Sequence, residues 1–248
     1  MQPAYLYIER VRKKSPEEKD EYPFNIPAIR GLKEIEFHSP VTFFVGENGM
    51  GKSTLIEAIA VKAGFNPEGG SRNFSFSTMD SHSLLYDYIV LSKSCRRNKD
   101  GYFLRAESYY NVASEIERLD EGVGGPPVKD SYGGKSLHKQ SHGESFMALL
   151  KHRLFGDGLY IFDEPEAALS PLSQLMMMAR IHELAELRSQ FIIATHSPIL
   201  MGYPGAEIYR LSSDGIEKAD YRFTEHYLIT RSFLENPERI LQKLLSSP

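Results

Sequence analysis

Cysteine is almost absent from this sequence. Its 248 residues include only Cys95, so no disulfide can form within the chain. This scarcity agrees with a reducing compartment, and we expect the protein to be cytoplasmic. Long apolar runs are missing as well, since no stretch of about 18 apolar residues occurs and the chain shows no signal-peptide pattern. The sequence therefore predicts no direct insertion into a membrane.

An excess of positive charge is also missing. The net charge is −4 and the sequence pI is about 6.1, which argues against a surface coated with cations for non-specific DNA binding. Apolar residues make up 41% and charged residues 25%, the balance of a globular protein with a sizeable core. A length of 248 residues suits one α/β domain, and we interpret residues 1–248 as a single domain.

Short apolar runs alternate with segments of helical character. Val41–Val45, residues 159–162 and residues 191–194 have the composition of buried strands, whereas Lys52–Ala63 and residues 171–187 are predicted helices. This alternation predicts an α/β fold with a mainly parallel sheet flanked by helices. The other expected elements are antiparallel additions near both ends, an extended segment at residues 84–91, a helix at residues 144–155 and a small helical subdomain over about residues 107–150.

A glycine-containing loop follows the first buried run and precedes the first helix. It fits the pattern G-x-x-x-x-G-K-[ST], in which glycines let successive backbone N–H groups curl around a phosphate. The positive end of the following helix points at the same place. Lys52 can then reach the β- and γ-phosphates, and the Ser53 hydroxyl suits Mg²⁺. The predicted nucleotide-binding residues are Gly46, Glu47, Asn48, Gly49, Met50, Gly51, Lys52, Ser53 and Thr54.

Two acids follow the apolar run at residues 159–162. A strand that ends at Asp163 places this carboxylate at the carboxyl edge of the sheet, beside the phosphate loop. Asp163 would hold Mg²⁺ there through a water, and Glu164 would accept a proton from the attacking water. Glu164 and Pro165 also suit an acidic helix cap. The phosphate loop favours the catalytic interpretation.

The order of these motifs resembles that of ABC-type ATPases over about residues 41–197. Residues 167–170 (Ala-Ala-Leu-Ser) are similar to the family's D-loop, which runs along the dimer seam. The resemblance implies that His196 is the family's switch histidine, which senses the γ-phosphate and helps to position the attacking water. It also implies that ATP and Mg²⁺ are bound, and that ATP is hydrolysed by a head-to-tail homodimer. The predicted catalytic residues are Lys52, Glu164 and His196.

The family's signature segment, which faces the ATP of the opposite subunit, is less regular here. Ser141 and Gly143 match its serine and second glycine, whereas His142 and Glu144 depart from its usual glycine and glutamine. A hydroxyl and a backbone N–H at a helix start can still bind a γ-phosphate. Ser141 and Glu144 also fit an ordinary helix cap, and the two roles are compatible. The residues predicted to face the partner's ATP are Ser141, Gly143 and Glu144.

The family's glutamine between the phosphate loop and the signature has no counterpart, since residues 51–139 contain no glutamine. Glu107 is the candidate replacement, because an acid at that place can bind Mg²⁺ directly or through water. A solvated strand end explains Glu107 equally well. The predicted metal ligands are Ser53, Asp163 and Glu107.

The segments around Glu164 and His196 resemble small stand-alone bacterial ATPases related to the DNA-repair and chromosome-maintenance branch of the family. The sequence also contains a basic cluster. One interpretation is a contact with nucleic acid or with a protein partner. The other is a solvated hairpin, because basic runs are usually exposed to solvent. The cluster consists of Lys93, Arg96, Arg97, Lys99 and Arg105.

We predict a nucleotide-switched dimer, in which the γ-phosphate closes the seam and hydrolysis assisted by Glu164 opens it. The effector is an unknown protein, nucleic acid is a further candidate, and DNA repair and phage defence are processes that the resemblance suggests. One alternative is the ATP-binding subunit of an ABC transporter. Another is a small-molecule phosphotransferase, which would leave His196 and the segment at Ser141 without roles.

Overall fold

The computed structural model describes residues 5–14, 20–72, 83–120 and 127–246. Its strands are β1 (Ile8–Lys13), β2 (Glu34–Glu36), β3 (Val41–Val45), β4 (Ile89–Lys93), β5 (Asp100–Arg105), β6 (Gly158–Asp163), β7 (Gln190–Ala194), β8 (Glu207–Ser212) and β9 (Gly215–Lys218). Its α-helices are α1 (Pro27–Arg30), α2 (Lys52–Ala63), α3 (Tyr109–Asp120), α4 (His142–His152), α5 (Pro171–Glu186), α6 (Pro198–Met201), α7 (Glu225–Glu235) and α8 (Pro237–Leu245). The 3₁₀ helices are η1 (Leu84–Tyr88), η2 (Val128–Tyr132), η3 (Leu137–Lys139), η4 (Pro165–Ala168) and η5 (Tyr221–Phe223).

The strands form two sheets. The central sheet has six strands in the order β5-β6-β7-β3-β8-β9, and every neighbouring pair is parallel except β8 and β9. The second sheet has three strands in the order β2-β1-β4 and is antiparallel. The α/β fold expected from the sequence is therefore confirmed, including its mainly parallel sheet, its antiparallel additions and its flanking helices.

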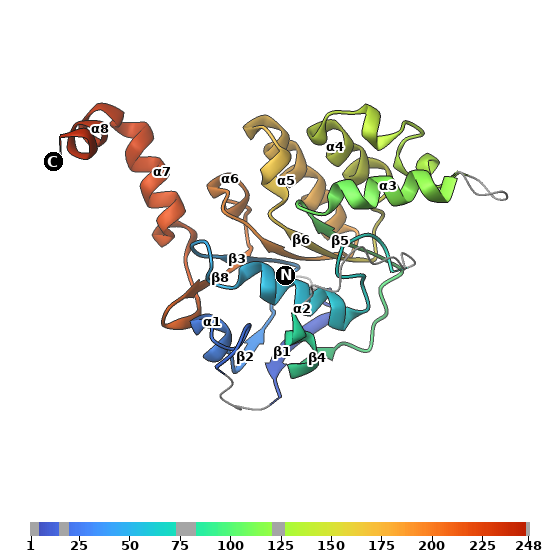
Figure 1. Cartoon of the computed structure of the whole chain (residues 1–248), viewed down its shortest axis with the longest axis horizontal. Coiled ribbons are helices and arrows are strands. Elements are labelled where there is room, and N and C mark those ends of the chain that lie inside the picture. Colours follow the sequence, from blue (N-terminus) through green and yellow to red (C-terminus); the bar gives the residue numbers. More distant parts are fainter. Residues whose placement is uncertain (1–4, 15–19, 73–82, 121–126, 247–248) are drawn as a thin grey trace.

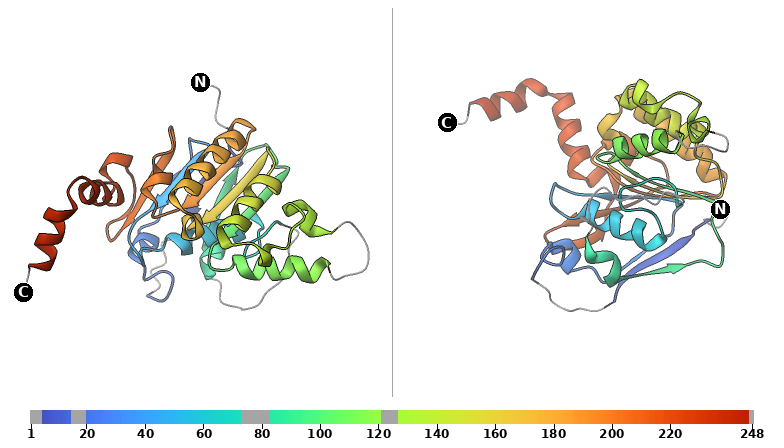
Figure 2. Two further views of the ribbon diagram at one scale, coloured as in Figure 1. Left: turned by 90° about the horizontal axis from the view of Figure 1, so that it is seen from above. Right: turned by 45° about the vertical axis from the view of Figure 1, so that its right-hand side comes forward.

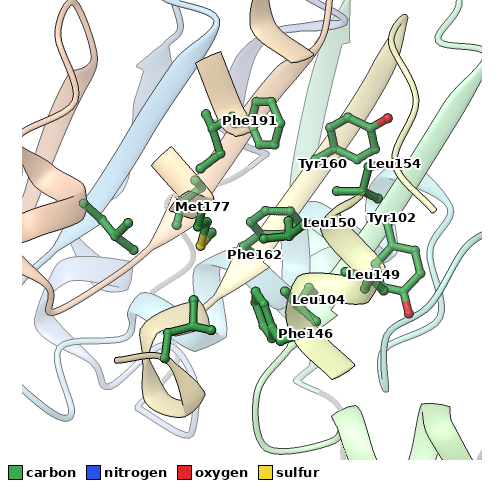
Figure 3. Close-up of a cluster of buried hydrophobic side chains, with 14 of the residues drawn as sticks. Tyr102, Leu104, Phe146, Leu149, Leu150, Leu154, Tyr160, Phe162, Met177 and Phe191 are labelled. Atoms are coloured by element: carbon green, nitrogen blue, oxygen red, sulfur yellow. The ribbon is translucent and has the colours of Figure 1, made fainter. Parts of the chain in front are cut away.

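Both faces of the central sheet are covered (Figure 1). One face packs under α3, α4 and α5, with Tyr160 and Phe162 of β6 in this core (Figure 3). The other face packs against α2 and the antiparallel sheet, with Leu159 and Ile161 of the same strand. Successive side chains of a strand point to opposite faces, so a strand buried on both faces must be apolar throughout. This explains the continuous apolar runs in the sequence.

Two elements begin at other residues than expected, and in each case a capping serine sets the start. Residues 84–91 do not form one extended segment, because Ser83 accepts a hydrogen bond from the Leu85 backbone and starts η1 before β4. The helix expected at residues 144–155 begins earlier, because Ser141 is its N-cap. By contrast, β3 and α2 have the expected bounds.

The chain ends in an arm formed by α7 and α8, which extends away from the rest of the molecule (Figures 1 and 2). Neither helix has a buried residue. No helix in the described ranges is long and apolar enough to cross a membrane. The exposed large apolar side chains of the arm are Leu228, Ile229, Phe233, Leu234, Leu241, Leu244 and Leu245.

Candidate functional site

The loop between β3 and α2 has a conformation that requires glycine at two points. Gly46 has a φ of 148°, and a Cβ there would lie 2.3 Å from the Leu211 carbonyl oxygen. Gly51 has a φ of 89°, and its Cβ would lie 3.0 Å from Cγ2 of Ile26. Side chains cannot be added at either position without moving the neighbouring structure. The glycines of the motif therefore let the loop turn tightly into the start of α2.

Lys52, the first residue of α2, lies back over this loop. Its Nζ donates a hydrogen bond of 3.0 Å to the backbone carbonyl of Glu47, and the residue is 4% exposed. Burial lowers the pKa of the ammonium, while Glu164, Asp163 and Glu166 act in the opposite direction. Lys52 is thus a buried cation near three carboxylates, with donor capacity left for a phosphate oxygen.

Asp163 ends β6 at the carboxyl edge of the central sheet, in register with Arg105 of β5 and Ala194 of β7. It is 4% exposed, and burial raises its pKa to about 7, although Arg105 and a hydrogen bond with Ser53 lower it. Within the described part of the chain, its Oδ1 has no hydrogen-bond partner. A buried carboxylate oxygen without a partner normally needs an explanation, and a bound cation is one.

This arrangement fits Mg²⁺. The Ser53 hydroxyl acts to lower the pKa of Asp163, and the two side chains are oxygen ligands of the type that Mg²⁺ prefers. The described residues contain no group of three or more His, Cys, Asp and Glu side chains able to hold a metal by themselves. Such a group is not required, because Mg²⁺ is usually bound by one or two protein ligands together with phosphates and waters.

Glu164 follows Asp163 in a left-handed backbone conformation, with φ 50° and ψ 51°. Such a conformation is uncommon for a residue with a side chain and costs about 1–3 kcal/mol. Its backbone N–H donates to the Ala194 carbonyl at 3.0 Å, and its side chain is 40% exposed. The strained turn therefore directs an accessible carboxylate to the cleft beside the phosphate loop, whose lining includes Glu164.

His196 lies next to this carboxylate. Its Nε2 is 3.4 Å from Oε1 of Glu164, and its backbone N–H donates to Oε1 of Glu166 at 2.5 Å. Its Nδ1 is 3.0 Å from Nε2 of His226, near the start of α7. The structure thus brings Glu164 and His196 together, as expected from the sequence, and adds His226 and Glu166. No sequence motif marks His226, which is about 30 residues further along the chain.

Arg105 is a further residue whose place the sequence did not reveal. Its guanidinium lies 2.5 Å from Oε2 of Glu57, a buried acid on α2, and 3.8 Å from Oδ2 of Asp163. The five residues of the basic cluster therefore do not lie together in space. Arg105 stands at the carboxyl end of β5, whereas Lys99 precedes the amino end of β5 and pairs with Asp157. The remaining members, Lys93, Arg96 and Arg97, line a cleft of about 490 Å³ together with Arg72.

A cleft of about 420 Å³ opens beside the phosphate loop. Tyr22 lies on its wall; the residue is 60% exposed, and its hydroxyl is 3.3 Å from Oγ1 of Thr54. An exposed aromatic ring at this distance from a phosphate site suits stacking on a base. Position along the chain alone could not distinguish Tyr22 from the other tyrosines. The lining residues are Tyr22, Asn25, Ile26, Asn48, Gly49, Gly51, Lys52, Ser53, Thr54 and Glu164.

The signature residues do not line this cleft. Ser141 caps α4 and forms a reciprocal capping box with Glu144. A Cβ at Gly143 would lie 3.1 Å from the carbonyl oxygen of Ala168, so the start of α4 lies against the segment at residues 167–170. Glu107 is also outside the cleft: its side chain is 85% exposed and lies 3.8 Å from Arg105.

Comparisons with known proteins give a family match over part of the chain and distant relatives. Residues 24–120 match a family described as "AAA domain". "ABC transporter G family member STR2" of Medicago truncatula is 24% identical over 184 residues, which are 67% of this chain and 25% of that protein. "ATP-binding cassette sub-family A member 7" of Rattus norvegicus is 25% identical over 181 residues, which are 68% of this chain and 8% of that protein. The chain therefore spans a quarter or less of the length of these relatives.

Solved structures resemble nearly the whole chain. A nucleotide-free ATP-binding cassette from an ABC transporter has a TM-score of 0.53 at 18% identity, covering 95% of this chain and 98% of that one. The cbiO1 protein of Clostridium perfringens, part of the cbiONQ transporter complex, has a TM-score of 0.51 at 18% identity. The match covers 96% of this chain and 99% of that one. The fold is thus that of a P-loop NTPase. Within that class, it is the fold of an ABC-type ATP-binding cassette.

Proposed function

We propose that this chain hydrolyses ATP with Mg²⁺ at the carboxyl edge of its central sheet. The observation that carries the proposal is the convergence of the phosphate loop, the buried Lys52 and the unpartnered Oδ1 of Asp163. Ser53 and Asp163 would hold the metal, which neutralises charge on the phosphates. Tyr22 would stack on the adenine, since its ring is exposed on the wall of the same cleft.

The neighbouring residues supply the remaining chemistry. Glu164 accepts a proton from a water, whose oxygen forms a bond to the γ-phosphorus while the bond to the β–γ bridging oxygen breaks, giving ADP and phosphate. Lys52 stabilises the negative charge on the transferred group. His196, 3.4 Å from Glu164, helps to orient the water and the γ-phosphate.

A second copy of the chain would complete this site. Ser141 and Glu144 are exposed at the start of α4, and no signature residue lines the cleft of its own subunit. We place the ATP of one subunit against the α4 start of the other, so that nucleotide binding closes a cytoplasmic, head-to-tail dimer and hydrolysis opens it. Residues 107–150 would act as a signature subdomain within a single domain.

The direct test is the variant Glu164→Gln, compared with Glu183→Gln, an exposed acid on α5. Glu164→Gln should abolish phosphate release while ATP binding remains, and it should sediment as a dimer only with ATP. Glu183→Gln should behave as wild type. Hydrolysis by Glu164→Gln at the wild-type rate would show that another group is the base.

A second candidate function is the ATP-binding subunit of a membrane transporter. The comparisons favour it, because one relative is named as an ABC transporter family member and both solved structures are described as coming from ABC transporters. Native purification of Glu164→Gln with ATP separates the two functions. A co-purifying membrane protein supports the transporter subunit, whereas stimulation of the ATPase activity of the wild-type protein by DNA supports a switch in DNA repair or phage defence.

A further inference from the structure

The C-terminal arm begins inside the proposed active site. His226 is the second residue of α7, and its Nε2 lies 3.0 Å from Nδ1 of His196. The two rings are 5.1 Å apart between centroids and inclined by 57°. Both imidazoles are half-buried. The contact joins the first turn of the arm to the residue that faces Glu164.

The arm is attached firmly to the segment that follows His196. The Tyr221 hydroxyl donates to the Pro198 carbonyl at 3.0 Å, and its ring packs on that of Tyr227, with centroids 4.7 Å apart. Thr224 is buried at the junction. The helix α6 begins two residues after His196, and α7 packs against α6. A rotation of α7 on α6 therefore moves His226 relative to His196.

The helix itself does not need His226. Thr224 caps α7, since its side chain accepts from the Tyr227 backbone N–H, and Glu225 supplies the favourable charge in the first turn. The side chain of His226 is therefore not explained by the local structure of the helix. Among the described residues, the hydrogen bond of the His226 ring is the one with His196.

This contact is compatible with a His196 imidazole that carries its proton on Nε2. A proton on Nε2 is the form that can donate to Glu164 Oε1, 3.4 Å away, or to a phosphate oxygen. Nδ1 must then be the acceptor, and Nε2 of His226 the donor, of the hydrogen bond between the rings. An imidazole that is bonded at one nitrogen has the orientation and tautomer of its other nitrogen determined.

We propose that His226 is a positioning residue, which holds His196 with Nε2–H directed at the reaction centre and couples the orientation of the arm to the nucleotide. The proposal rests on the proposed ATPase function. Nucleotide that moves His196 must move or release α7, and anything that rotates the arm must change hydrolysis. The long arm turns a small displacement at its base into a larger one at α8.

Steady-state kinetics of His226→Ala and His226→Gln test the positioning role. Thr230→Ala, one turn further along α7 and exposed, is the matched control. We expect His226→Ala to lower kcat about fivefold to tenfold with little change in KM, the effect of one hydrogen bond. His226→Gln should recover much of the rate, because its amide can still donate to Nδ1. Equal rates for His226→Ala and Thr230→Ala would overturn the proposal.

A double-mutant cycle separates positioning from a merely structural role. If His226 acts through His196, then adding His226→Ala to His196→Ala should lower kcat no further. The same fivefold to tenfold loss in both backgrounds would mean that His226 acts independently of His196, and the proposal would fall.

The coupling has a readout that does not depend on turnover. Cys95, the single cysteine and exposed, can carry one spin label, and Gln242→Cys on α8 can carry the other. In the Glu164→Gln background, diluted with unlabelled protein, ATP with Mg²⁺ should shift the distance distribution, and His226→Ala should abolish the shift. No ATP-induced shift would contradict the coupling, even if wild-type protein hydrolyses ATP. A shift without hydrolysis in the wild type would contradict only the proposed function.

Discussion

The charged side chains at the two ends of the central sheet differ in how completely they are paired. At the carboxyl edge, Oδ1 of Asp163, Oε2 of Glu166 and Nε2 of His196 are buried without hydrogen-bond partners among the described residues. Lys52 is buried beside them, and Glu164 holds a strained backbone conformation. Unsatisfied polar groups and strain lower stability, so this edge is not arranged for the stability of the free chain.

At the amino edge of the same strands, the acids are saturated. Asp100, which starts β5, accepts from Arg153 at 2.9 Å and from the Tyr160 hydroxyl at 2.8 Å. Asp157, just before β6, pairs with Arg188 at 2.6 Å, and its pKa is lowered to about 2 by hydrogen bonds from Arg188 and Lys99. The amino edge thus stabilises the fold, and the carboxyl edge retains capacity for something that the chain itself does not supply.

The largest expected effect is that of Lys52→Ala. Loss of the cation should lower kcat/KM for ATP by about a hundredfold or more, because it removes charge stabilisation from a water-poor site. Lys62→Ala, at the other end of the same helix, is the control and should keep wild-type kinetics. A loss below about tenfold would show that Lys52 does not contact the transferred phosphate.

Asp163→Asn should separate activity from stability. We expect ATP turnover to fall by about a hundredfold. The free energy of unfolding without nucleotide should rise by about 1 kcal/mol, because an amide removes a buried charge that lacks full hydrogen bonding. Chemical denaturation and a phosphate-release assay measure the two quantities. Destabilisation by Asp163→Asn would contradict the contrast between the edges.

Tyr22→Ala should have an intermediate effect. Removing the ring should raise KM for ATP about fivefold to tenfold, the usual value of one aromatic contact, while kcat stays close to wild type. Tyr22→Phe keeps the stacking surface and loses only the hydroxyl bond to Thr54, so it should bind ATP nearly normally. If Tyr22→Phe were as weak as Tyr22→Ala, the hydroxyl and not the ring would matter.

The smallest effect on hydrolysis is expected for Asp100→Asn, at the amino edge. Turnover by the folded protein should not change, whereas the free energy of unfolding should fall by about 2 kcal/mol, since Arg153 loses a half-buried partner. A changed kcat with unchanged stability would reverse the roles assigned to the two edges.

The same variant makes a prediction on pH. Burial would raise the pKa of Asp100, but the positive charge of Arg153 and hydrogen bonds from Arg153, the Tyr160 hydroxyl and the Phe155 backbone outweigh it and lower the pKa. A carboxyl whose folded pKa lies below its unfolded value stabilises the protein fully above that unfolded value, about pH 4. This contribution is lost as the pH falls through the folded pKa. Asp100→Asn should therefore lose less stability than wild type on acidification below about pH 4.

Much of the fold could be predicted from sequence, because strands buried on both faces must be continuously apolar. Val41–Val45 and the runs inside β6 and β7 show this plainly. Capping was harder to use, because Ser83 accepts a hydrogen bond that starts the 3₁₀ helix Leu84–Tyr88 ahead of β4, and apolar composition does not reveal this bond. The orientation of α7 and α8 depends on the contacts of Tyr221 and His226, which no periodicity encodes.

The site residues that stand in short sequence motifs could be predicted. Lys52, Asp163 and Glu164 each stand in a pattern with a strand on one side, and the parallel register brings them to one edge. Arg105, Tyr22 and His226 reach the site from separate elements and have no pattern of their own. The catalytic and binding roles assigned to all of these residues remain predictions.

The most direct measurement is a crystal structure of Glu164→Gln grown with ATP and Mn²⁺, with anomalous scattering used to locate the metal. The account predicts one strong peak between Ser53 and Asp163, against the β- and γ-phosphates, with Lys52 on the γ-phosphate and the adenine on Tyr22. A metal bound away from Asp163, or a triphosphate that does not reach Lys52, would contradict it.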